Sequence, residues 1–456
     1  MTRDNQLMKI HQRYGLFTLG VLNQESYKTL LFLNNIQLKN LKFTPGENLI
    51  LRVGMTELQV EVATQYINPS MNMLYLSSNV LKDLYYYQGE PLKAIFISKN
   101  KFVLGPSLGL TISHYTWKNI DKSHAVKKRA LLALEKGILF YCFILNRVNW
   151  ETNLVKAYCL DPTNNEWVKK RIPLPQVIHD RGSYPGPETV ESFNHKGKAH
   201  NIQWINTTRT FGKWETFQAL SLFRKTSQYL PETALLTSSK LMSFLEKYKH
   251  CFIKNNYGRG GRQVVRIEKG EGFYICKTGG SEVKSWEFTD MQKLHSFLHI
   301  NYGANLVLQQ GIFLAKIHHC PFDMRILVQK KPDRRWVVSG LNFRIAKPEA
   351  IVTNFSAGAR DLFVSPGEEL FHAALSWDML ESFSLKTVYA MEKSFGSLGE
   401  VGLDVALDRD GKLWLLEANS RPSSIAYREA SPEACEQIYG LPLEYASSLV
   451  KGNYYN

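Results

Sequence analysis

The stretch from Val401 to Asn419 constrains the fold of this chain more than any other, because its pattern predicts a β-hairpin with one apolar face. Two runs of alternating residues flank the turn Asp408–Gly411, and a short loop that ends in glycine is typical of antiparallel strands joined directly. We place Leu407 opposite Lys412, and successive side chains then point to opposite faces. The pairs that follow are Asp404 with Leu415 and Glu417 with Gly402.

This register separates apolar from polar side chains. Asp404, Glu417 and Asn419 share one face. A slip of one residue would divide the apolar set between both faces, so the hydrophobic pattern specifies the pairing. The residues expected on the buried face are Val401, Leu403, Val405, Leu407, Trp414, Leu416 and Ala418.

Three oxygen-bearing side chains on one face of a hairpin suit a hard cation. Mg²⁺ typically binds one or two carboxylates and keeps positions for phosphates and water. We therefore predict a metal site at Asp404, Glu417 and Asn419. The alternative is a solvated hairpin with incidental acidic residues.

A glycine-rich loop joins two strand-like runs within Cys251–Ile267. Glycine lets backbone N–H groups approach phosphate oxygens closely, and Lys254 supplies positive charge at the end of the first run. The loop is not a Walker A motif, because GxxxxGK[ST] is missing. It is either a phosphate-binding loop or an ordinary hairpin turn, and its residues include Gly258, Arg259, Gly260, Gly261 and Arg262.

Two strand motifs are weak evidence when taken alone. The apolar run Leu306–Ile312 ends in Gln309 and Gln310; it either offers backbone groups to an adenine edge or is a core strand. Asp323 and Arg325 stand two residues apart and so share a strand face. Arg325 either binds a terminal phosphate or forms a structural ion pair on that face.

A polar loop follows a further strand near Arg344. The loop Ile351–Arg360 is rich in small residues and contains Asn354. It is either a substrate- or phosphate-binding loop or a plain turn.

The rest of the chain shows a coarse pattern of elements. Residues 1 to about 100 are β-rich, and the following segment alternates strand, helix and strand, which predicts a small α/β unit. Helices are expected over Lys213–Tyr229 and Ser238–Tyr248, and strand-like runs dominate from there to Val338.

Length and charge limit the class of protein. The chain has 456 residues, of which 44% are hydrophobic, so it is long enough for two or three domains. Its formal charge of +15 is uneven, because 15 Asp and Glu stand against 7 Lys and Arg from Asp361 onward, and the first 360 residues therefore carry +23. This surplus suits a polyanionic partner such as nucleotide phosphates, nucleic acid or an acidic polymer, or it is a generic solvated surface.

Two absences in the sequence point to a cytosolic protein. No run approaches the ~20 apolar residues of a membrane helix, and the first residues lack the apolar segment of a signal peptide. The six cysteines form no CxxC pair. Reduced buried thiols are therefore expected rather than a zinc site or disulfides.

Together and in this order, the motifs resemble the ATP-grasp superfamily, and more narrowly the YheC/YheD family of endospore coat-associated proteins. The similarity covers about residues 206–450. It is carried by Gly212–Glu215, Leu230–Thr233, Lys254 with its glycine-rich loop, Gln309–Ile312, Phe322–Arg325, Val352–Ser356, Gly402–Asp404 and Leu416–Pro422.

The resemblance implies an α+β architecture in three domains. An ATP-grasp fold, with two α+β lobes around the nucleotide, is expected over residues 206–452. A small α/β pre-ATP-grasp domain is expected over residues 105–205, and a β-rich N-terminal domain over residues 1–104.

The resemblance also implies roles for individual residues. ATP and Mg²⁺ or Mn²⁺ are the expected cofactors. The residues expected to bind the phosphates are Lys213, Lys254, Gly258, Arg259, Gly260 and Gly261; those for adenine are Gln309, Gln310 and Ile312; those for the metal are Asp404, Glu417 and Asn419. Arg325 would hold the γ-phosphate, and Arg344, Asn354 and Arg421 would lie near the acyl phosphate or the acceptor.

Two positions depart from the family pattern. Many ATP-grasp enzymes have an acidic residue after the hinge glutamine, where this chain has Gln310. The loop after Asn354 commonly ends in two glycines, where this chain has Gly358-Ala359. The first difference affects contacts to the ribose, and the second affects acceptor binding.

The implied function is that of an ATP- and Mg²⁺-dependent carboxylate–amine ligase that acts through an acyl phosphate. Its carboxylate and amine substrates are not identified, and a peptide-like substrate is expected. The location implied is the cytoplasm of the mother cell or forespore, or the spore coat, with coat proteins as partners. The alternative is a non-catalytic coat-assembly protein that keeps the fold, and nucleic-acid binding is the weakest hypothesis because it depends on charge alone.

Overall fold

The computed structural model of the chain describes residues 15–22, 28–64, 73–83, 91–98, 100–182, 188–258, 264–278, 283–348, 350–353, 358–423 and 430–452. The chain separates into two compact units. The first contains residues 1–205, 332–334 and 439–456, and the second contains residues 206–331 and 335–438. The finer division into three domains stays a prediction.

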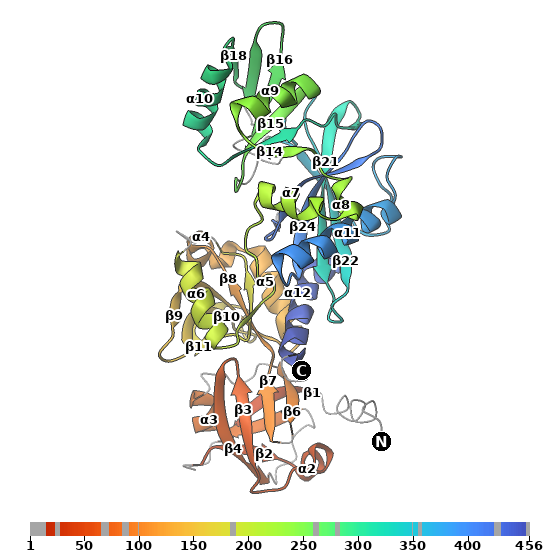
Figure 1. Ribbon diagram of the computed structural model, residues 1–456. Helices are drawn as coiled ribbons and strands as arrows, with labels where there is room; N and C mark the ends of the chain where they lie inside the picture. The colour runs from red at the N-terminus through yellow and green to blue at the C-terminus, as the bar shows by residue number, and fades with distance from the viewer. Residues whose placement is uncertain are drawn as a thin grey trace. The chain divides into compact units, whose positions relative to one another are not determined.

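The first unit begins with a closed β-barrel (Figure 1). Its strands follow the order β1-β5-β2-β4-β3-β7-β6. Closure leaves no unpaired sheet edge. The elements are β1 (Gly15–Leu22), β2 (Leu30–Leu33), α2 (Asn35–Leu41), β3 (Asn48–Val53), β4 (Thr56–Thr64), β5 (Met73–Ser77), α3 (Ser78–Asp83), β6 (Pro91–Ser98) and β7 (Lys101–Leu104).

A six-stranded mixed sheet follows in the same unit, in the order β11-β10-β9-β8-β12-β13. Strands β8, β9, β12 and β13 run parallel to their neighbours in this part of the sheet, as expected for an α/β unit. The elements are β8 (Ser107–Thr111), α4 (His114–Lys118), a 3₁₀ turn (Ile120–Lys122), α5 (His124–Glu135), β9 (Leu139–Asn149), β10 (Leu154–Leu160), β11 (Trp167–Pro173), β12 (Val177–Asp180), α6 (Glu188–Ala199) and β13 (Gln203–Trp204).

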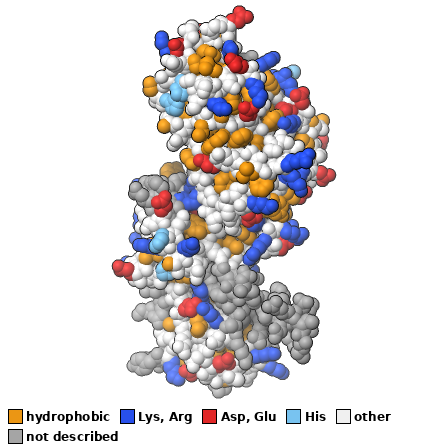
Figure 2. Space-filling model, in the orientation of Figure 1, with side chains coloured by type: hydrophobic (Ala, Val, Ile, Leu, Met, Phe, Trp, Pro, Cys, Tyr) orange, Lys and Arg blue, Asp and Glu red, His pale blue; other side chains and the backbone are white. Residues whose placement is uncertain are grey.

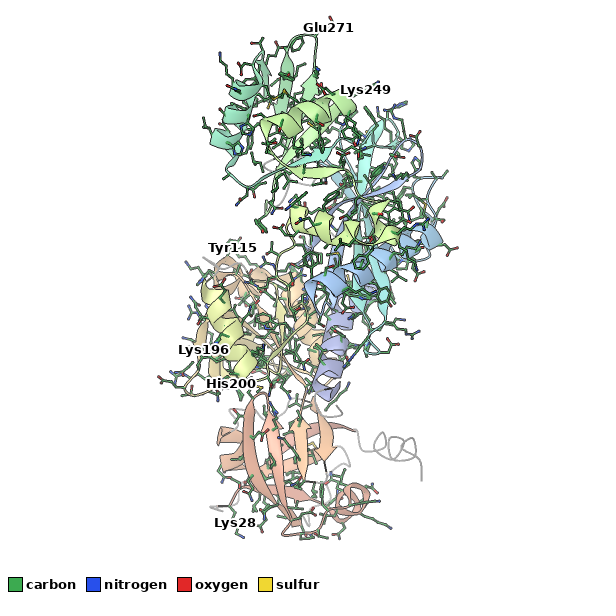
Figure 3. All side chains as sticks on the ribbon, in the orientation of Figure 1. Lys28, Tyr115, Lys196, His200, Lys249 and Glu271 are labelled. Atoms are coloured by element: carbon green, nitrogen blue, oxygen red, sulfur yellow. The ribbon has the colours of Figure 1, made fainter. Side chains whose placement is uncertain are left out.

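The second unit contains two sheets, which we call the upper and the lower sheet. The upper sheet has the order β14-β19-β15-β16-β17-β18. Two helices cover one of its faces (Figure 1), and Glu271 lies at the exposed tip of the β16–β17 hairpin (Figure 3). The elements are β14 (Thr233–Leu235), α9 (Ser238–Lys247), β15 (His250–Asn255), β16 (Val264–Lys269), β17 (Tyr274–Thr278), β18 (Ser285–Phe288), α10 (Met291–Tyr302) and β19 (Leu306–Gln310).

The lower sheet has the order β23-β22-β21-β24-β25, and the short strand β20 pairs with β21. Helix α11 packs on one face of it. The elements are α7 (Lys213–Ser221), α8 (Arg224–Ser227), β20 (Lys316–Ile317), β21 (Cys320–Lys330), β22 (Trp336–Ile345), β23 (Arg360–Val364), α11 (Trp377–Phe395), β24 (Glu400–Leu407), β25 (Leu413–Asn419) and α12 (Pro432–Gly452). From Tyr439 onward α12 belongs to the first unit.

Alternation along β21 determines which side chains face the core of the lower sheet. One set of alternate residues joins a cluster with side chains of α11, and the other set carries Asp323 and Arg325 to the opposite face. The core set of β21 is Phe322, Met324, Ile326 and Val328, each at most 1% exposed.

The upper sheet is built in the same way. Cys251, Ile253, Val265 and Ile267 pack against α9 and α10, which turns Phe252, Lys254 and Arg266 to the other face. Both sheets therefore cover their apolar faces with helices and keep a polar face for a common cavity.

Three of the sequence predictions for helices need correction. The helix predicted over Lys213–Tyr229 is broken into α7 and α8. The helix predicted from Ser238 to Tyr248 ends at Lys247, and its cap is Thr237, whose side chain accepts a hydrogen bond from the Lys240 N–H. Helix α10 lies in a region where strand-like runs were expected to dominate and no helix was named. Its buried side chains are few, Leu294 and Leu298, so its periodic signal is weak.

The chain-wide charge is not gathered into one patch on the face drawn in Figure 2. Among the residues coloured there, blue Lys and Arg side chains lie between red Asp and Glu side chains. Over the described part of the chain, no helix combines the length and the apolar character needed to cross a membrane.

Asn206 holds the two strands of the C-terminal hairpin together at their open end. Its buried side chain donates to the carbonyls of Glu400 (2.7 Å) and Ser420 (2.8 Å) and accepts from the N–H groups of Gly399 (2.8 Å) and Glu400 (3.1 Å). One amide thus satisfies four backbone groups that water does not reach.

We predict that Asn206→Ala lowers the free energy of unfolding of the second unit by about 2–4 kcal/mol, because it leaves several buried backbone groups without partners. Chemical denaturation followed by tryptophan fluorescence measures this change. Asn301→Ala is the control, since the Asn301 amide makes an exposed bond to the Phe297 carbonyl and should cost about 0.5 kcal/mol or less. Equal losses in the two variants would contradict the role given to Asn206.

Candidate functional site

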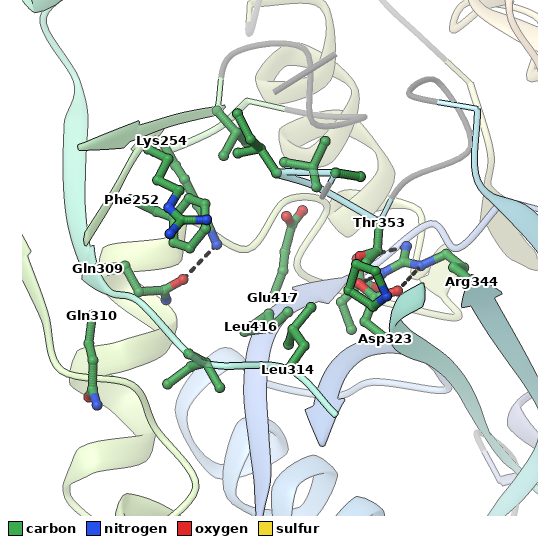
Figure 4. A pocket seen from close by; sticks show the side chains of 18 of the residues that line it. Phe252, Lys254, Gln309, Gln310, Leu314, Asp323, Arg344, Thr353, Leu416 and Glu417 are labelled. Carbon is green, nitrogen blue, oxygen red and sulfur yellow. Dashed lines mark hydrogen bonds and ion pairs between the residues drawn. The ribbon is translucent and has the colours of Figure 1, made fainter. Parts of the chain in front are cut away.

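A cavity of about 380 Å³ opens between the polar faces of the upper and lower sheets of the second unit (Figure 4). Phe252, Lys254 and Arg266 line it from the upper sheet, and Asp323 and Glu417 are among the residues that line it from the lower sheet. A concave site with convergent polar groups is the usual form of a ligand-binding site.

Positive charge dominates the described lining of the cavity. Seven Lys and Arg side chains stand against three Asp and Glu side chains. Burial lowers the pKa of His250 to about 4, so this lining imidazole is neutral at neutral pH. The excess of cations suits an anionic ligand. The cations are Lys213, Lys254, Arg266, Lys316, Arg325, Arg344 and Arg409, and the carboxylates are Asp323, Asp404 and Glu417.

The strand registers place the charged residues of the lower sheet directly opposite each other. Arg325 on β21 pairs with Asp404 on β24, which pairs in turn with Glu417 on β25. Asp323 on β21 pairs with Arg344 on β22. Cross-strand neighbours of this kind have side chains on one face and in contact.

These side chains form a continuous ionic network. Arg325 binds both carboxylate oxygens of Asp404, with Nη2 at 2.8 Å from Oδ2. Arg344 binds Asp323 through two bonds of 2.6 and 2.5 Å and reaches Asp404 at 3.2 Å. Thr353 adds a hydrogen bond to Asp323 (Figure 4).

The network determines the protonation of its members. Burial alone raises the pKa of Asp404, but Arg325 and Arg344 outweigh burial and hold the pKa below its ordinary value. Burial acts to lower the pKa of Arg344, and the two carboxylates reverse that effect and raise it. Asp404 is therefore a carboxylate at neutral pH despite being only 9% exposed.

The predicted register of the C-terminal hairpin is wrong. Asp404 lies opposite Glu417, not Leu415, and Gly402 lies opposite Asn419, not Glu417. The pairing shifts between Asp404 and Val405, where a β-bulge interrupts the ladder. A bulge places two residues of one strand against one of the other and re-aims a side chain.

The pairing also differs from the prediction at the turn, where Leu407 lies opposite Leu413, not Lys412. This shift of one residue changes which side chains are buried: Leu413 and Leu415 are 1% and 4% exposed and join the core, although the predicted apolar face contained Trp414 and Leu416. Leu416 lines the cavity instead. The bulge adds a second shift of one residue, so Asp404, Glu417 and Asn419 line the cavity together, as the alternation indicated.

Lys213, at the first position of α7, links that helix to Glu417 and to the end of β15. Its Nζ donates to the Gly258 carbonyl at 2.9 Å and lies 3.5 Å from a carboxylate oxygen of Glu417. Asn256 fixes the start of the helix, since its carbonyl accepts from the Lys213 N–H and its Oδ1 accepts from the Trp214 N–H. The lysine is thereby held at the cavity.

Lys254 projects from β15 and donates to the Gln309 side chain at 2.6 Å (Figure 4). Burial, together with the nearby charge of Lys213, lowers the pKa of Lys254 to about 8, although the carboxylates of the cavity act in the opposite direction. An ammonium group kept from water in this way gains from any anion that enters the cavity.

The segment after β19 forms the connection between the two sheets. Gln310 is fixed by Glu232, because the Gln310 N–H donates to the Glu232 carbonyl and the Gln310 side chain accepts from the Glu232 N–H. A Cβ atom on Gly311 would lie 2.2 Å from the His250 ring, so only glycine fits there. Ile312 lines the cavity just beyond.

The structure brings most of the predicted residues to this cavity. Arg421 is not among the described residues that line it. Asn354, Arg259, Gly260 and Gly261 lie outside the described residues. The predicted residues in the lining are Lys213, Lys254, Gly258, Gln309, Gln310, Ile312, Arg325, Arg344, Asp404, Glu417 and Asn419.

Several lining residues were missed by the sequence analysis. Phe252 and Arg266 are cross-strand partners on the cavity face. Phe252 stands two residues before Lys254, so strand alternation from that lysine could have indicated it. Leu416 could not be found in this way, because the residues from Leu413 to Leu416 are all apolar and their pattern does not show that Leu407 pairs with Leu413 rather than Lys412.

The chemistry of the lining fits a hard divalent cation at the hairpin. Over the described residues no three His, Cys, Asp or Glu side chains gather as a metal site, but Asp404 and Glu417 are adjacent carboxylates. The amide nitrogen of Asn419 is buried and has no hydrogen-bond partner among the described residues, so the amide is free to turn its oxygen toward an ion. Two carboxylates and an amide oxygen are the donors that Mg²⁺ prefers.

Comparisons with known proteins agree with the motifs. The endospore coat-associated protein YheD of Bacillus subtilis (strain 168) is 27% identical over 354 residues, which cover 72% of this chain and 75% of the relative. YheC of the same organism, also endospore coat-associated, is 27% identical over 337 residues, which cover 71% of this chain and 91% of the relative. The solved structure of the D-cycloserine synthetase DcsG has a TM-score of 0.47 and 12% identity, and covers 76% of this chain and 99% of that one.

The family assignment follows from a model of a whole domain. The model for the YheC/D-like ATP-grasp family matches residues 201–449, more than half of the chain, and confirms both the resemblance and the α+β ATP-grasp fold expected from the motifs. The protein is therefore a member of the YheC/D-like ATP-grasp family.

Proposed function

We propose that the second unit is an ATP- and Mg²⁺-dependent carboxylate–amine ligase. The observation that carries the proposal is the cavity itself, in which cations from both sheets surround the adjacent carboxylates Asp404 and Glu417. Such a site suits a polyphosphate with its metal ion, because phosphoryl transfer depends mainly on positioning and charge neutralisation.

The phosphates are assigned to Lys213 and Lys254. Among the described residues, the Lys254 ammonium group donates a hydrogen bond to the neutral Gln309 amide and has no carboxylate partner. It therefore gains a charged partner when a phosphate enters. Lys213 already contacts Glu417 and can hold a phosphate and the carboxylate together. Backbone from Gly258 to Gly261 would close over them.

Adenine is assigned to the connection between the sheets. Gln309, Gln310 and Ile312 line the cavity at that point, and Leu416 and Phe252 supply apolar surface near them. A planar base gains from apolar contacts on its faces and from backbone hydrogen bonds at its edge.

Mg²⁺ or Mn²⁺ is assigned to Asp404, Glu417 and Asn419, where it would neutralise charge on the terminal phosphates. Arg325, next to Asp404, would hold the γ-phosphate. Arg344 lines the cavity next to Arg325, since both contact Asp404, and it would face the acyl phosphate. Asn354 and Arg421 remain proposed acceptor residues.

The proposed reaction has two steps. A substrate carboxylate attacks the γ-phosphorus of ATP, and ADP leaves with the electron pair of the broken P–O bond. An amine then attacks the carbonyl carbon of the acyl phosphate, the C–O bond to phosphate breaks, and inorganic phosphate leaves with that electron pair and takes up the proton that the nitrogen loses as the amide forms. The arginines stabilise the charge on the transferred phosphoryl group and so lower the barrier to both steps.

The names of the two curated relatives support a place in the endospore coat. We infer that the protein acts during spore formation, in the cytoplasm or at the coat, on a carboxylate that is peptide-like. A coat-assembly protein that keeps the fold without catalysis is the alternative, and the same variant tests both.

We predict that Glu417→Gln lowers ATP turnover in the presence of a carboxylate and an amine by at least about 100-fold, because it removes one of two adjacent carboxylates that hold the metal. ADP release measures turnover, and thermal unfolding checks the fold. Glu271→Gln, at an exposed hairpin tip (Figure 3), is the matched control and should keep full activity. If spores that carry Glu417→Gln are indistinguishable from wild-type spores, the result would favour the alternative of a coat-assembly protein without catalysis.

We also predict that binding of the non-hydrolysable analogue AMPPNP weakens as the pH rises above about 8. The pKa of Lys254 is about 8 in the free protein, and a bound phosphate favours the charged form and raises that pKa. Binding therefore takes up a proton between about pH 8 and the higher pKa of the complex. Calorimetry in buffers of different ionisation enthalpy measures this uptake.

The variant Lys254→Met provides the control for the pH experiment. It should bind AMPPNP more weakly at pH 7 and lose the proton uptake. Proton uptake that persists in Lys254→Met would assign the titration to another group.

A further inference from the structure

The cations of the cavity can be sorted by their partners. Lys254 has no carboxylate partner among the described residues, but its ammonium group donates to the Gln309 side chain. Near the metal ligands, Arg325 and Arg344 are held by Asp404 and Asp323, and Lys213 lies against Glu417. Arg266 pairs with Glu268 at 2.5 Å. These arginines and Lys213 have carboxylate partners in the protein itself.

Lys316 and Arg409 differ from that group. Both line the cavity where it is open to solvent, because both side chains are exposed. Neither forms an ion pair with any residue that the structure describes. Arg409 has an acidic residue on each side. Asp408 is engaged, because it accepts hydrogen bonds from two backbone N–H groups and from the Trp414 indole, and the exposed Asp410 forms no ion pair with a described residue.

The backbone brings these two cations to the same end of the lower sheet, where β21 begins and β24 ends. Arg409 donates its N–H to the Phe313 carbonyl at 3.1 Å, and Leu314 bridges to Asp408. Lys316 follows two residues later on β20, opposite Pro321 at the start of β21. Pro321 itself lines the cavity two residues before Asp323.

Arg409 is also held in position by an aromatic ring. Its guanidinium carbon lies 4.5 Å from the centre of the Phe313 ring, and that ring packs against His250 at 4.8 Å. A stacked guanidinium loses less conformational freedom when it binds an anion than a free one does. The His250 ring is neutral, so it gives the Arg409 guanidinium no negatively charged partner.

We propose that Lys316 and Arg409 form a subsite for a second anionic group on the substrate, a carboxylate or a phosphate, apart from the carboxylate that is activated. This inference rests on the proposed function, because it takes the first carboxylate to react beside Arg325 and Arg344. A substrate with two anionic groups is then held by two pairs of cations, which fixes its orientation. The substrate class is a dicarboxylate or a phosphorylated carboxylate.

The experiment uses the full chain loaded with AMPPNP and Mg²⁺. Three probes of similar size are titrated at constant ionic strength: glutarate, with two carboxylates; 3-phosphonopropionate, with one carboxylate and one phosphonate; and butyrate, with one carboxylate. We expect glutarate or 3-phosphonopropionate to bind at least about tenfold more tightly than butyrate, as hydrogen bonds between charged groups predict. Calorimetry and the rise in Tm measure the affinity, and the better of the two dianions identifies the second group.

The variants Lys316→Met and Arg409→Met should each remove most of that preference. Lys316→Arg should restore it, and Lys249→Met, at an exposed position (Figure 3), should leave it unchanged. AMPPNP affinity should stay within about twofold in all variants.

Two results would overturn the inference. Equal binding of all three probes by the wild-type chain would show that no second anion is recognised. Loss of AMPPNP affinity in Lys316→Met or Arg409→Met would assign these cations to the nucleotide. The same titration without nucleotide separates this inference from the proposed function. If the chain fails to bind AMPPNP but still prefers dianions through Lys316 and Arg409, the proposed function is contradicted and the anion subsite is not.

Discussion

The site depends on a chain of four charges that crosses three neighbouring strands of the lower sheet. Arg325, Asp404, Arg344 and Asp323 alternate in sign and contact one another in that order. Removing charges from water is costly unless partners and hydrogen bonds compensate. Because each carboxylate here has a guanidinium partner, the lower sheet can keep a charged polar face beside a core in which the alternate residues of β21 are almost fully buried.

The same network holds the charged side chains of the polar face in fixed positions, although they are not packed in an apolar core. A fork of N–H donors fits a carboxylate in one geometry, so the arginines fix each other's positions through the shared Asp404. A ligand with phosphate groups meets donors that are already aligned. Pre-aligned donors cost less conformational entropy at the moment of binding than flexible ones.

The sequence predicted those features that depend on the order of the motifs and on the alternation of side chains along the strands. The family, the α+β ATP-grasp fold and the membership of Asp404, Glu417 and Asn419 on one polar face all followed from motif order and strand periodicity. The pairing did not, because the strands pair one residue away from the prediction at the turn and a bulge adds a second shift beside Asp404. Helix α10 was missed because few of its side chains are buried. Leu416 was assigned to the wrong face because of the shift at the turn.

Asn206 connects the start of the second unit to the hairpin that carries the proposed metal ligands. It is the first residue of the second unit, and its amide grips the beginning of β24 and the residue that follows β25. The residue that begins the second unit is therefore bonded to the strand pair that carries Asp404 and Glu417. Loss of these bonds would act first on the spacing between β24 and β25, and so on the distance between the two carboxylates that line the ligand cavity.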